Sequence, residues 1–220
     1  MSKLIVDERI MKSAVYGGAV LGGGGGGKIA DGLERGYLAL ERGKIEIVPL
    51  SSLSLDDIIV TASSVGSPKA QNRYIEPDYY VRAMEVFLSR NPKCVKGIIT
   101  SENGAAASVN GWLQAASLGL PVLDSPCNGR AHPTGTMGSM GLEKDLKYIS
   151  QQTAVGGNKN NGTYLELFVE GNINTTAELV RDAAGRAGGV VAVARNPVTV
   201  SYAMENAAPG GLSYAIRIGE

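Results

Sequence analysis

Six consecutive glycines followed by a lysine are the first residues in this sequence whose types and spacing could do chemistry. Bare backbone of this kind exposes N–H groups that can hold an anion, and a helix that begins directly after it adds its positive dipole end. We therefore expect the segment to bind a small anionic or carbonyl-bearing ligand. The alternative is close backbone packing against a sheet or a second subunit, which glycine also permits. The expected ligand-binding residues are Gly22, Gly23, Gly24, Gly25, Gly26, Gly27 and Lys28.

A nucleotide-binding loop is a second interpretation of the same segment. Gly22, Gly27 and Lys28 fit the pattern G-x-x-x-x-G-K. Ile29 stands where the pattern needs a Ser or Thr to bind magnesium, and the residues before Gly22 have helical periodicity where a P-loop needs a strand. A nucleotide- or phosphate-binding module is therefore the weakest of the functional hypotheses.

Small polar residues follow the apolar segment VKGIIT at Glu102, Asn103 and Gly104. In an open α/β sheet the ligand crevice lies beyond the carboxyl ends of the strands, so this position favours a site. Glu102 is a candidate general base or partner of a substrate amide, and it could equally cap the helix that follows. Asn103 and Gly104 are expected to bind substrate.

A second such segment, LPVLDSPCNGRAHPTG, contains the remaining catalytic candidates Asp124, Cys127 and His132. Cys127 lies five residues before His132 and could form a nucleophile and base pair with it. The alternatives are a buried, inert cysteine and a structural or exposed histidine. His132 is the only histidine, which excludes a multi-histidine metal site within this chain. A mixed site with Asp124 or Glu102 stays open, and nothing in the sequence requires a cofactor.

Gly129 and Arg130 complete the expected substrate-binding residues. A guanidinium among glycine and proline residues suits a carboxylate, phosphate or imide oxygen. Its alternative role is a salt bridge to Asp124 or Glu102 that holds the loop.

Positioning these residues requires an α/β architecture. Asp7 is expected to cap a helix that runs to the glycines, and a second helix follows over 28–43. Further along, the periodicity predicts strands at 44–50, 56–66, 95–104 and 120–123, with helices at 76–90 and 105–119. This alternation is typical of a parallel sheet with right-handed crossovers. A hairpin over 151–171, a helix over 175–189, a strand over 190–196 and two helical pieces around Pro209 complete the pattern.

We therefore predict a single α/β domain over residues 1–220. It has three layers, a mainly parallel central sheet and a glycine-rich helix-loop-helix at the N-terminus. Residues 1–150 would supply the glycine loop and the parallel-sheet core. Residues 151–220 would supply a hairpin and a closing α/β segment of the same domain.

Composition narrows the possible partners. The chain has 21 basic and 21 acidic residues and a pI near 6.6. It therefore lacks the excess of positive charge that is typical of nucleic-acid-binding proteins. No apolar run is long enough to span a bilayer, and no membrane partner is expected. Two cysteines, Cys94 and Cys127, fit a reducing compartment, and the expected location is the cytoplasm.

Together, the glycine run, the strand that ends at Asn103-Gly104 and the segment VLDSPCNGRAHPT resemble the N-terminal domain of the S-methyl thiohydantoin desulfurase family. The resemblance runs from about Asp7 to the end of the chain. It implies an α/β domain linked to hydantoin and thiohydantoin metabolism and usually encoded alongside hydantoinase-type subunits. Its most specific residues are Gly22 to Gly27, Asp124, Gly129, Arg130, Ala131 and Pro133.

Two functional hypotheses follow. The first is an enzyme, or half of one, that hydrolyses a cyclic amide such as a hydantoin or S-methyl thiohydantoin. The second is a non-catalytic partner subunit that docks on a hydantoinase-like protein or on a second copy of itself, because symmetric dimers are the commonest oligomers.

Overall fold

A computed structural model describes residues 3–66, 73–90, 95–132, 134 and 136–220 of the chain. Cys94 and Pro133 lie outside the described residues. The strands are β1 (Leu4–Ile5), β2 (Glu46–Val48), β3 (Ile58–Gly66), β4 (Val95–Thr100), β5 (Val122–Leu123), β6 (Ser150–Gly156), β7 (Leu165–Gly171) and β8 (Val190–Thr199). The helices are α1 (Glu8–Gly22), α2 (Ile29–Arg42), α3 (Pro77–Arg90), α4 (Trp112–Leu118), α5 (Ile173–Arg186), α6 (Val200–Asn206) and α7 (Gly211–Gly219). Short 3-10 helices lie at η1 (Leu50–Ser52), η2 (Ala107–Val109), η3 (Leu142–Lys144) and η4 (Lys159–Asn161).

The strands of the described residues form one eight-stranded sheet in the order β1-β2-β5-β4-β3-β8-β6-β7. The sheet is mixed, so the prediction of a mainly parallel sheet is not confirmed. Only β2, β5, β4 and β3 are parallel neighbours. The hairpin β6–β7 joins the sheet through β8, which lies antiparallel between β3 and β6.

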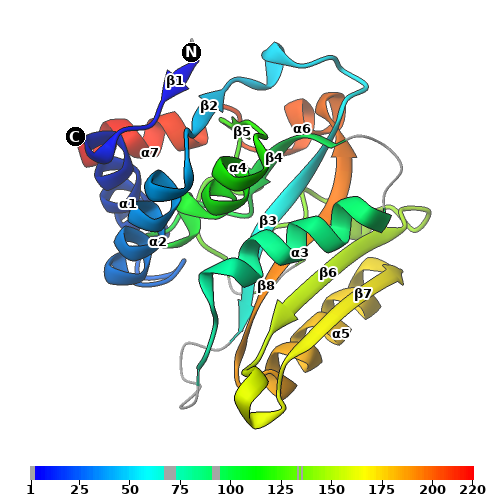
Figure 1. Ribbon diagram of the computed structural model, residues 1–220. Coiled ribbons are helices and arrows are strands. Elements are labelled where there is room, and N and C mark those ends of the chain that lie inside the picture. The colour runs from blue at the N-terminus through cyan, green and yellow to red at the C-terminus, as the bar shows by residue number, and fades with distance from the viewer. Residues whose placement is uncertain (1–2, 67–72, 91–94, 133, 135) are drawn as a thin grey trace.

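Helices cover both faces of the sheet, and two neighbouring residues of β6 show this. The Thr153 hydroxyl donates to the Ala83 carbonyl of α3 at 2.7 Å, whereas Gln152 Nε2 donates to Thr176 Oγ1 of α5 at 2.9 Å. Consecutive strand residues point to opposite faces, so α3 and α5 lie on opposite sides of the sheet, as Figure 1 shows.

The first two helices begin and end where local signals predict. Asp7 Oδ1 accepts the Ile10 N–H at 2.7 Å and caps the start of α1. The helix ends before Gly23, which adopts the left-handed conformation with a φ of 55°. The second helix, α2, ends before Gly43 as expected. The two helices pack against each other, α1 also packs against α7, and α2 packs against α4, away from the β6–β7 end of the sheet (Figure 1).

The helix predicted over 105–119 is broken. The structure has η2 and then α4, which are separated at Gly111. A Cβ at Gly111 would lie 2.7 Å from Cγ2 of Ile98, and its φ is +90°, so the chain crosses β4 too closely for a continuous helix.

The strand predicted over 190–196 continues to Thr199, where helical structure had been expected from Pro197. The pairing of β8 with β3 shifts register between Ile59 and Thr61, which leaves Asn196 and Pro197 at a bulge. Proline lacks the N–H of a regular ladder and is accommodated at such a bulge.

No helix among the described residues is long and apolar enough to cross a membrane.

Candidate functional site

Glu102 and His132 form a buried pair just beyond the carboxyl end of β4. The imidazole Nε2 lies 3.1 Å from Glu102 Oε2, and the backbone N–H of His132 donates to the same oxygen at 2.9 Å. The two side chains are only 13% and 6% exposed. The structure thus brings together two predicted catalytic residues that lie 30 positions apart in the chain.

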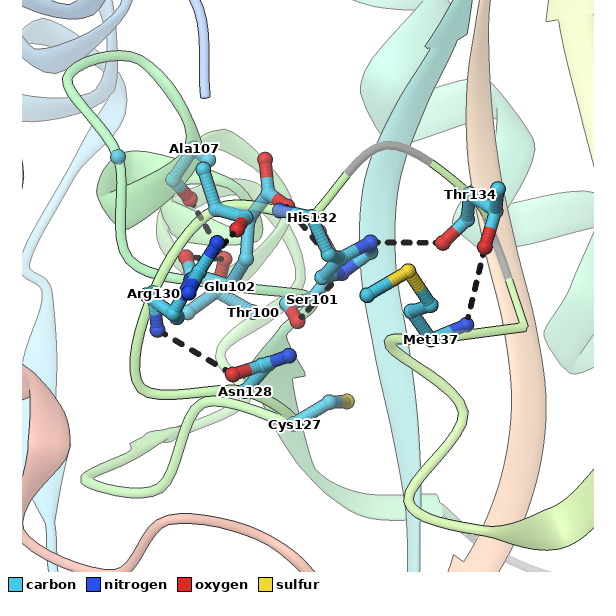
Figure 2. A network of polar contacts seen from close by, with 12 residues as sticks. Thr100, Ser101, Glu102, Ala107, Cys127, Asn128, Arg130, His132, Thr134 and Met137 are labelled. Carbon is cyan, nitrogen blue, oxygen red and sulfur yellow. Dashed lines mark hydrogen bonds and ion pairs between the residues drawn. The ribbon is translucent and has the colours of Figure 1, made fainter. Parts of the chain in front are cut away.

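The imidazole of His132 is held on more than one side. Its Nδ1 lies 2.7 Å from the carbonyl oxygen of Thr134, and its Nε2 lies 3.4 Å from that of Ser101. Figure 2 shows the ring of His132 between Glu102 and Thr134. Contacts of this kind set which ring nitrogen carries the proton.

Burial raises the pKa of Glu102 above its ordinary value. The His132 backbone N–H, the His132 ring and the Arg195 guanidinium oppose this effect without reversing it. A carboxyl with a raised pKa is suited to donate and accept protons closer to neutral pH.

Cys127 is buried and contacts Thr61 instead of His132. Its Sγ lies 3.2 Å from Thr61 Oγ1, and no hydrogen bond joins Cys127 to His132 in the described part of the chain. Burial raises the pKa of the Cys127 thiol to about 11. Because the thiolate is the nucleophile, this environment favours the alternative of an inert core cysteine.

Asp124 fixes the N-terminus of α7. Its Oδ1 accepts the Ser213 N–H at 2.8 Å, its Oδ2 accepts the Ser213 hydroxyl at 2.5 Å, and its carbonyl accepts the Gly210 N–H at 2.7 Å. The side chain is buried. These contacts favour a capping role for Asp124 over the predicted role in proton transfer.

Asn103 and Gly104 connect segments of the backbone. The fully buried Asn103 donates through Nδ2 to the carbonyls of Gly211 at 2.9 Å and Gly129 at 3.4 Å. Gly104 accepts the Ser108 N–H at 2.9 Å. Both residues therefore hold the turn after β4 in place.

The glycine run joins α1 to α2 and packs against that turn. The carbonyl of Gly26 accepts N–H groups from Ala106 and Ala107, both at 2.9 Å. A Cβ at Gly25 would lie 2.7 Å from Cβ of Ala131, and one at Gly27 would lie 2.7 Å from Cβ of Ala106. The arrangement supports the close-packing interpretation for these positions.

Other residues of the run are open. Nothing lies within 4 Å of a Cβ built at Gly23 or Gly24, whereas a Cβ at Gly22 would lie 3.0 Å from Cα of Gly104 and 3.8 Å from Cβ of Ala131. Lys28 is exposed and precedes α2 without a capping side-chain bond. Because helix α1 precedes the run, the strand that a P-loop requires is not in that position.

Arg130 is exposed and lies two residues before His132 in the sequence. Its Nε donates to the Ala131 carbonyl at 3.3 Å, and its N–H donates to Asn128 Oδ1 at 3.3 Å. Among the described residues it forms no salt bridge to Asp124 or Glu102, so the guanidinium is available to a ligand.

Sequence reasoning missed Arg195 of β8. Its side chain is buried, and it interacts through space with Cys127 and Glu102. The only sequence signal is a single cation inside the apolar strand VVAVARN. Within the described ranges there is no group of three or more His, Cys, Asp or Glu residues that could hold a metal ion.

Comparisons with known proteins identify the family and the fold of the chain. The family model described as "S-Me-THD-like, N-terminal domain" matches residues 11–164. A crystal structure of a protein from Chromobacterium violaceum, a structural genomics target, is similar to this chain with a TM-score of 0.78 and 22% identity. That similarity covers 98% of this chain and 60% of the other, and at this identity it shows the fold alone. No curated protein matches the sequence significantly.

Proposed function

The chain belongs to the S-Me-THD-like N-terminal domain family, and from that premise we propose that it hydrolyses a cyclic amide, or forms half of a site that does. The match confirms the family resemblance predicted from the sequence. Hydantoins and S-methyl thiohydantoins are the proposed substrate class. The observation that carries the proposal is the buried Glu102 carboxyl in contact with His132.

In the proposed reaction, a water molecule attacks an electrophilic carbon of the ring. Glu102, assisted by His132, accepts a proton from that water, and the C–N or C–S bond then breaks. The proton returns to the leaving nitrogen or sulfur, so water is added and no other reactant is needed. The raised pKa of Glu102 supports this role, because general acid–base catalysis is most effective when the pKa lies near the working pH.

Arg130 and the glycine run would bind the substrate. Arg130 is exposed without a carboxylate partner in the described residues and would orient an anionic or carbonyl group. Gly23 and Gly24 have open space around them and would expose backbone N–H groups to oxygen atoms of the ligand. Cys127 and Asp124 have other partners and are not needed for the proposed steps.

The test is an assay of the purified chain with hydantoin and with an S-methyl thiohydantoin. Ring opening is followed by NMR and methanethiol release by thiol titration. We expect Glu102→Gln to lower the rate about 10²- to 10⁴-fold, the range for loss of a general acid or base. Glu205→Gln is the matched control, because Glu205 is exposed on α6. Equal rates in wild type and Glu102→Gln would refute the proposed role of Glu102.

The second candidate is a non-catalytic subunit that docks on a hydantoinase-like protein or on a second copy of this chain. Three exposed apolar side chains flank the glycine run and favour it. Tyr16 and Val20 on α1 are 43% and 66% exposed, and Ile29 at the start of α2 is 41% exposed. Light scattering with and without a hydantoinase-type subunit tests this candidate. A monomer that binds no such subunit would refute it.

A further inference from the structure

Buried polar atoms without a hydrogen-bond partner gather at one place in the sheet. Six such side-chain atoms occur among the described residues. Three of them, Ser63 Oγ, Arg195 Nε and Gln152 Oε1, belong to the neighbouring strands β3, β8 and β6. Buried polar groups without a partner are rare in folded proteins, and each one calls for an explanation such as a bound water, an ion or a functional role.

The strand register places these side chains on one face. Arg195 pairs directly with Thr61 on one side and with Gln152 on the other, and Ser63 lies two residues beyond Thr61. Residues in register, or two apart along a strand, share a face of the sheet. It is the face covered by α5, because Gln152 Nε2 donates to Thr176 of that helix.

Arg195 carries a charge that the described residues do not neutralise by contact. Its Nε has no hydrogen-bond partner among the described residues, although the residue is only 4% exposed. Burial lowers its pKa, but a guanidinium stays protonated at neutral pH because its ordinary pKa exceeds about 12. Glu102 interacts with Arg195 through space but does not contact it. A buried cation without a contacting anion is unfavourable, which favours a site that takes a compensating anion.

The backbone beside Arg195 is also unusual. The next residue, Asn196, is buried and has a φ of +54°, and it lies at the β3–β8 bulge. Bulges redirect side chains, and left-handed conformations outside glycine cluster at ligand sites. Asn196 is held there by the Ser150 hydroxyl, which donates to its Oδ1 at 2.8 Å.

We propose that Arg195, Ser63 and Gln152 form a subsite for a ligand that carries a carboxylate with an N–H group beside it. The guanidinium and the Ser63 hydroxyl donate to the carboxylate oxygens, because the planar fork of arginine matches a carboxylate. The unpartnered Gln152 Oε1 accepts the ligand N–H. This inference rests on the proposed function and specifies the ligand, because hydrolysis of hydantoin adds one water across a ring C–N bond and yields N-carbamoylglycine, which has both groups.

Binding is measured by calorimetry and thermal denaturation of the full chain with N-carbamoylglycine, acetate and hydantoin. At a hundredfold excess over the Kd, N-carbamoylglycine should raise the Tm by about 5–10 °C. Acetate should bind more weakly because it lacks the N–H. Binding of hydantoin should not depend on Arg195, because hydantoin carries no carboxylate.

Two variants make the test specific. Arg195→Met removes the buried charge and should weaken N-carbamoylglycine binding at least about tenfold, while its Tm stays equal or rises. Gln152→Glu places a carboxylate opposite Arg195 and should likewise weaken binding at least about tenfold and raise the Tm. Asn160→Asp in the β6–β7 connection makes the same chemical change at an exposed position and should have no effect.

The subsite and the proposed function can fail separately. If wild type binds no carboxylate, or if both variants bind N-carbamoylglycine as wild type does, the cluster holds water only and the subsite is refuted. Turnover in wild type, together with N-carbamoylglycine binding that is unchanged in both variants, would leave the hydrolytic function standing without the subsite. Binding that depends on Arg195 in a chain that turns over no cyclic amide would establish the subsite and refute the hydrolysis.

Discussion

The backbones of Gly26 and Gly104 meet so closely that a Cβ built on either residue would lie 2.5 Å from the Cα of the other. This contact joins the loop between α1 and α2 to the turn after β4. The same turn includes Glu102, one member of the candidate catalytic pair. The glycine run therefore helps to position the site by packing, whether or not it also contacts a ligand.

A pair of glycine variants separates packing from conformational strain. Gly26 and Gly24 have similar positive φ values, +74° and +92°, but only Gly26 is in tight contact. We expect Gly24→Ala to cost about 1 kcal/mol of unfolding free energy, because alanine disfavours positive φ. Gly26→Ala should cost about 1–3 kcal/mol more, because the added methyl overpacks the contact. Urea denaturation measures both, and equal losses would contradict the packing role.

The interaction between Asp124 and Ser213 predicts a structural phenotype. Asp124→Asn should lower the unfolding free energy by about 1–3 kcal/mol, because a buried charged acceptor at the start of α7 is lost. Ser213→Ala should have a similar effect, and the double variant should lose less than the sum because the two residues share one interaction. Chemical denaturation of all three proteins checks this. Additive losses would show that Asp124 stabilises the fold through other contacts.

Local signals in the sequence were sufficient for the first two helices and the hairpin. Asp7 predicted the start of α1, Gly43 predicted the end of α2, and 151–171 predicted β6 and β7. The position of β8 between β3 and β6 could not be predicted, because strand pairing depends on contacts between distant segments. The break at Gly111 likewise follows from the closeness of Ile98 on another element.

In the candidate site, too, local signals identified single residues, whereas contacts between distant segments could not be predicted. Residue type and strand-end position identified Glu102 and His132 individually, but their contact depends on how the loop after β5 folds back. Proximity in sequence suggested a pair of Cys127 with His132, whereas the fold places Cys127 against Thr61 of β3. Arg195 was missed because a single arginine in a strand does not show whether it points to solvent or into the core.

Arg130 offers a variant with little structural cost. Its side chain is exposed, and its Nε donates to the carbonyl of the neighbouring Ala131. Arg130→Ala should therefore change the unfolding free energy by no more than about 0.5 kcal/mol. If Arg130 orients the substrate, the same variant should raise KM or abolish binding of hydantoins. Parallel measurements of Tm and of ligand binding check this, and a large loss of stability would point to a structural role instead.

The pH dependence of stability tests the environment of Glu102. Burial raises its folded-state pKa above the unfolded value, so the folded protein holds the proton at pH values where the unfolded chain has released it. The stabilising effect of the neutral carboxyl is fully present below the unfolded pKa, about 4.3, and is lost as the pH rises through the folded pKa. The unfolding free energy of wild type should therefore fall over this window relative to that of Glu102→Gln.

Each unit of upward shift corresponds to about 1.4 kcal/mol of difference between the two proteins once the pH exceeds the folded pKa. Urea denaturation from pH 4 to pH 8 should give curves for wild type and Glu102→Gln that diverge with rising pH and then run parallel. Glu205→Gln, which changes an exposed carboxyl, should follow wild type throughout. Divergence in the opposite direction, with wild type gaining stability as the pH rises, would mean that His132 and Arg195 together outweigh burial. In that case Glu102 would be a permanently charged partner of His132 instead of a proton donor near neutral pH.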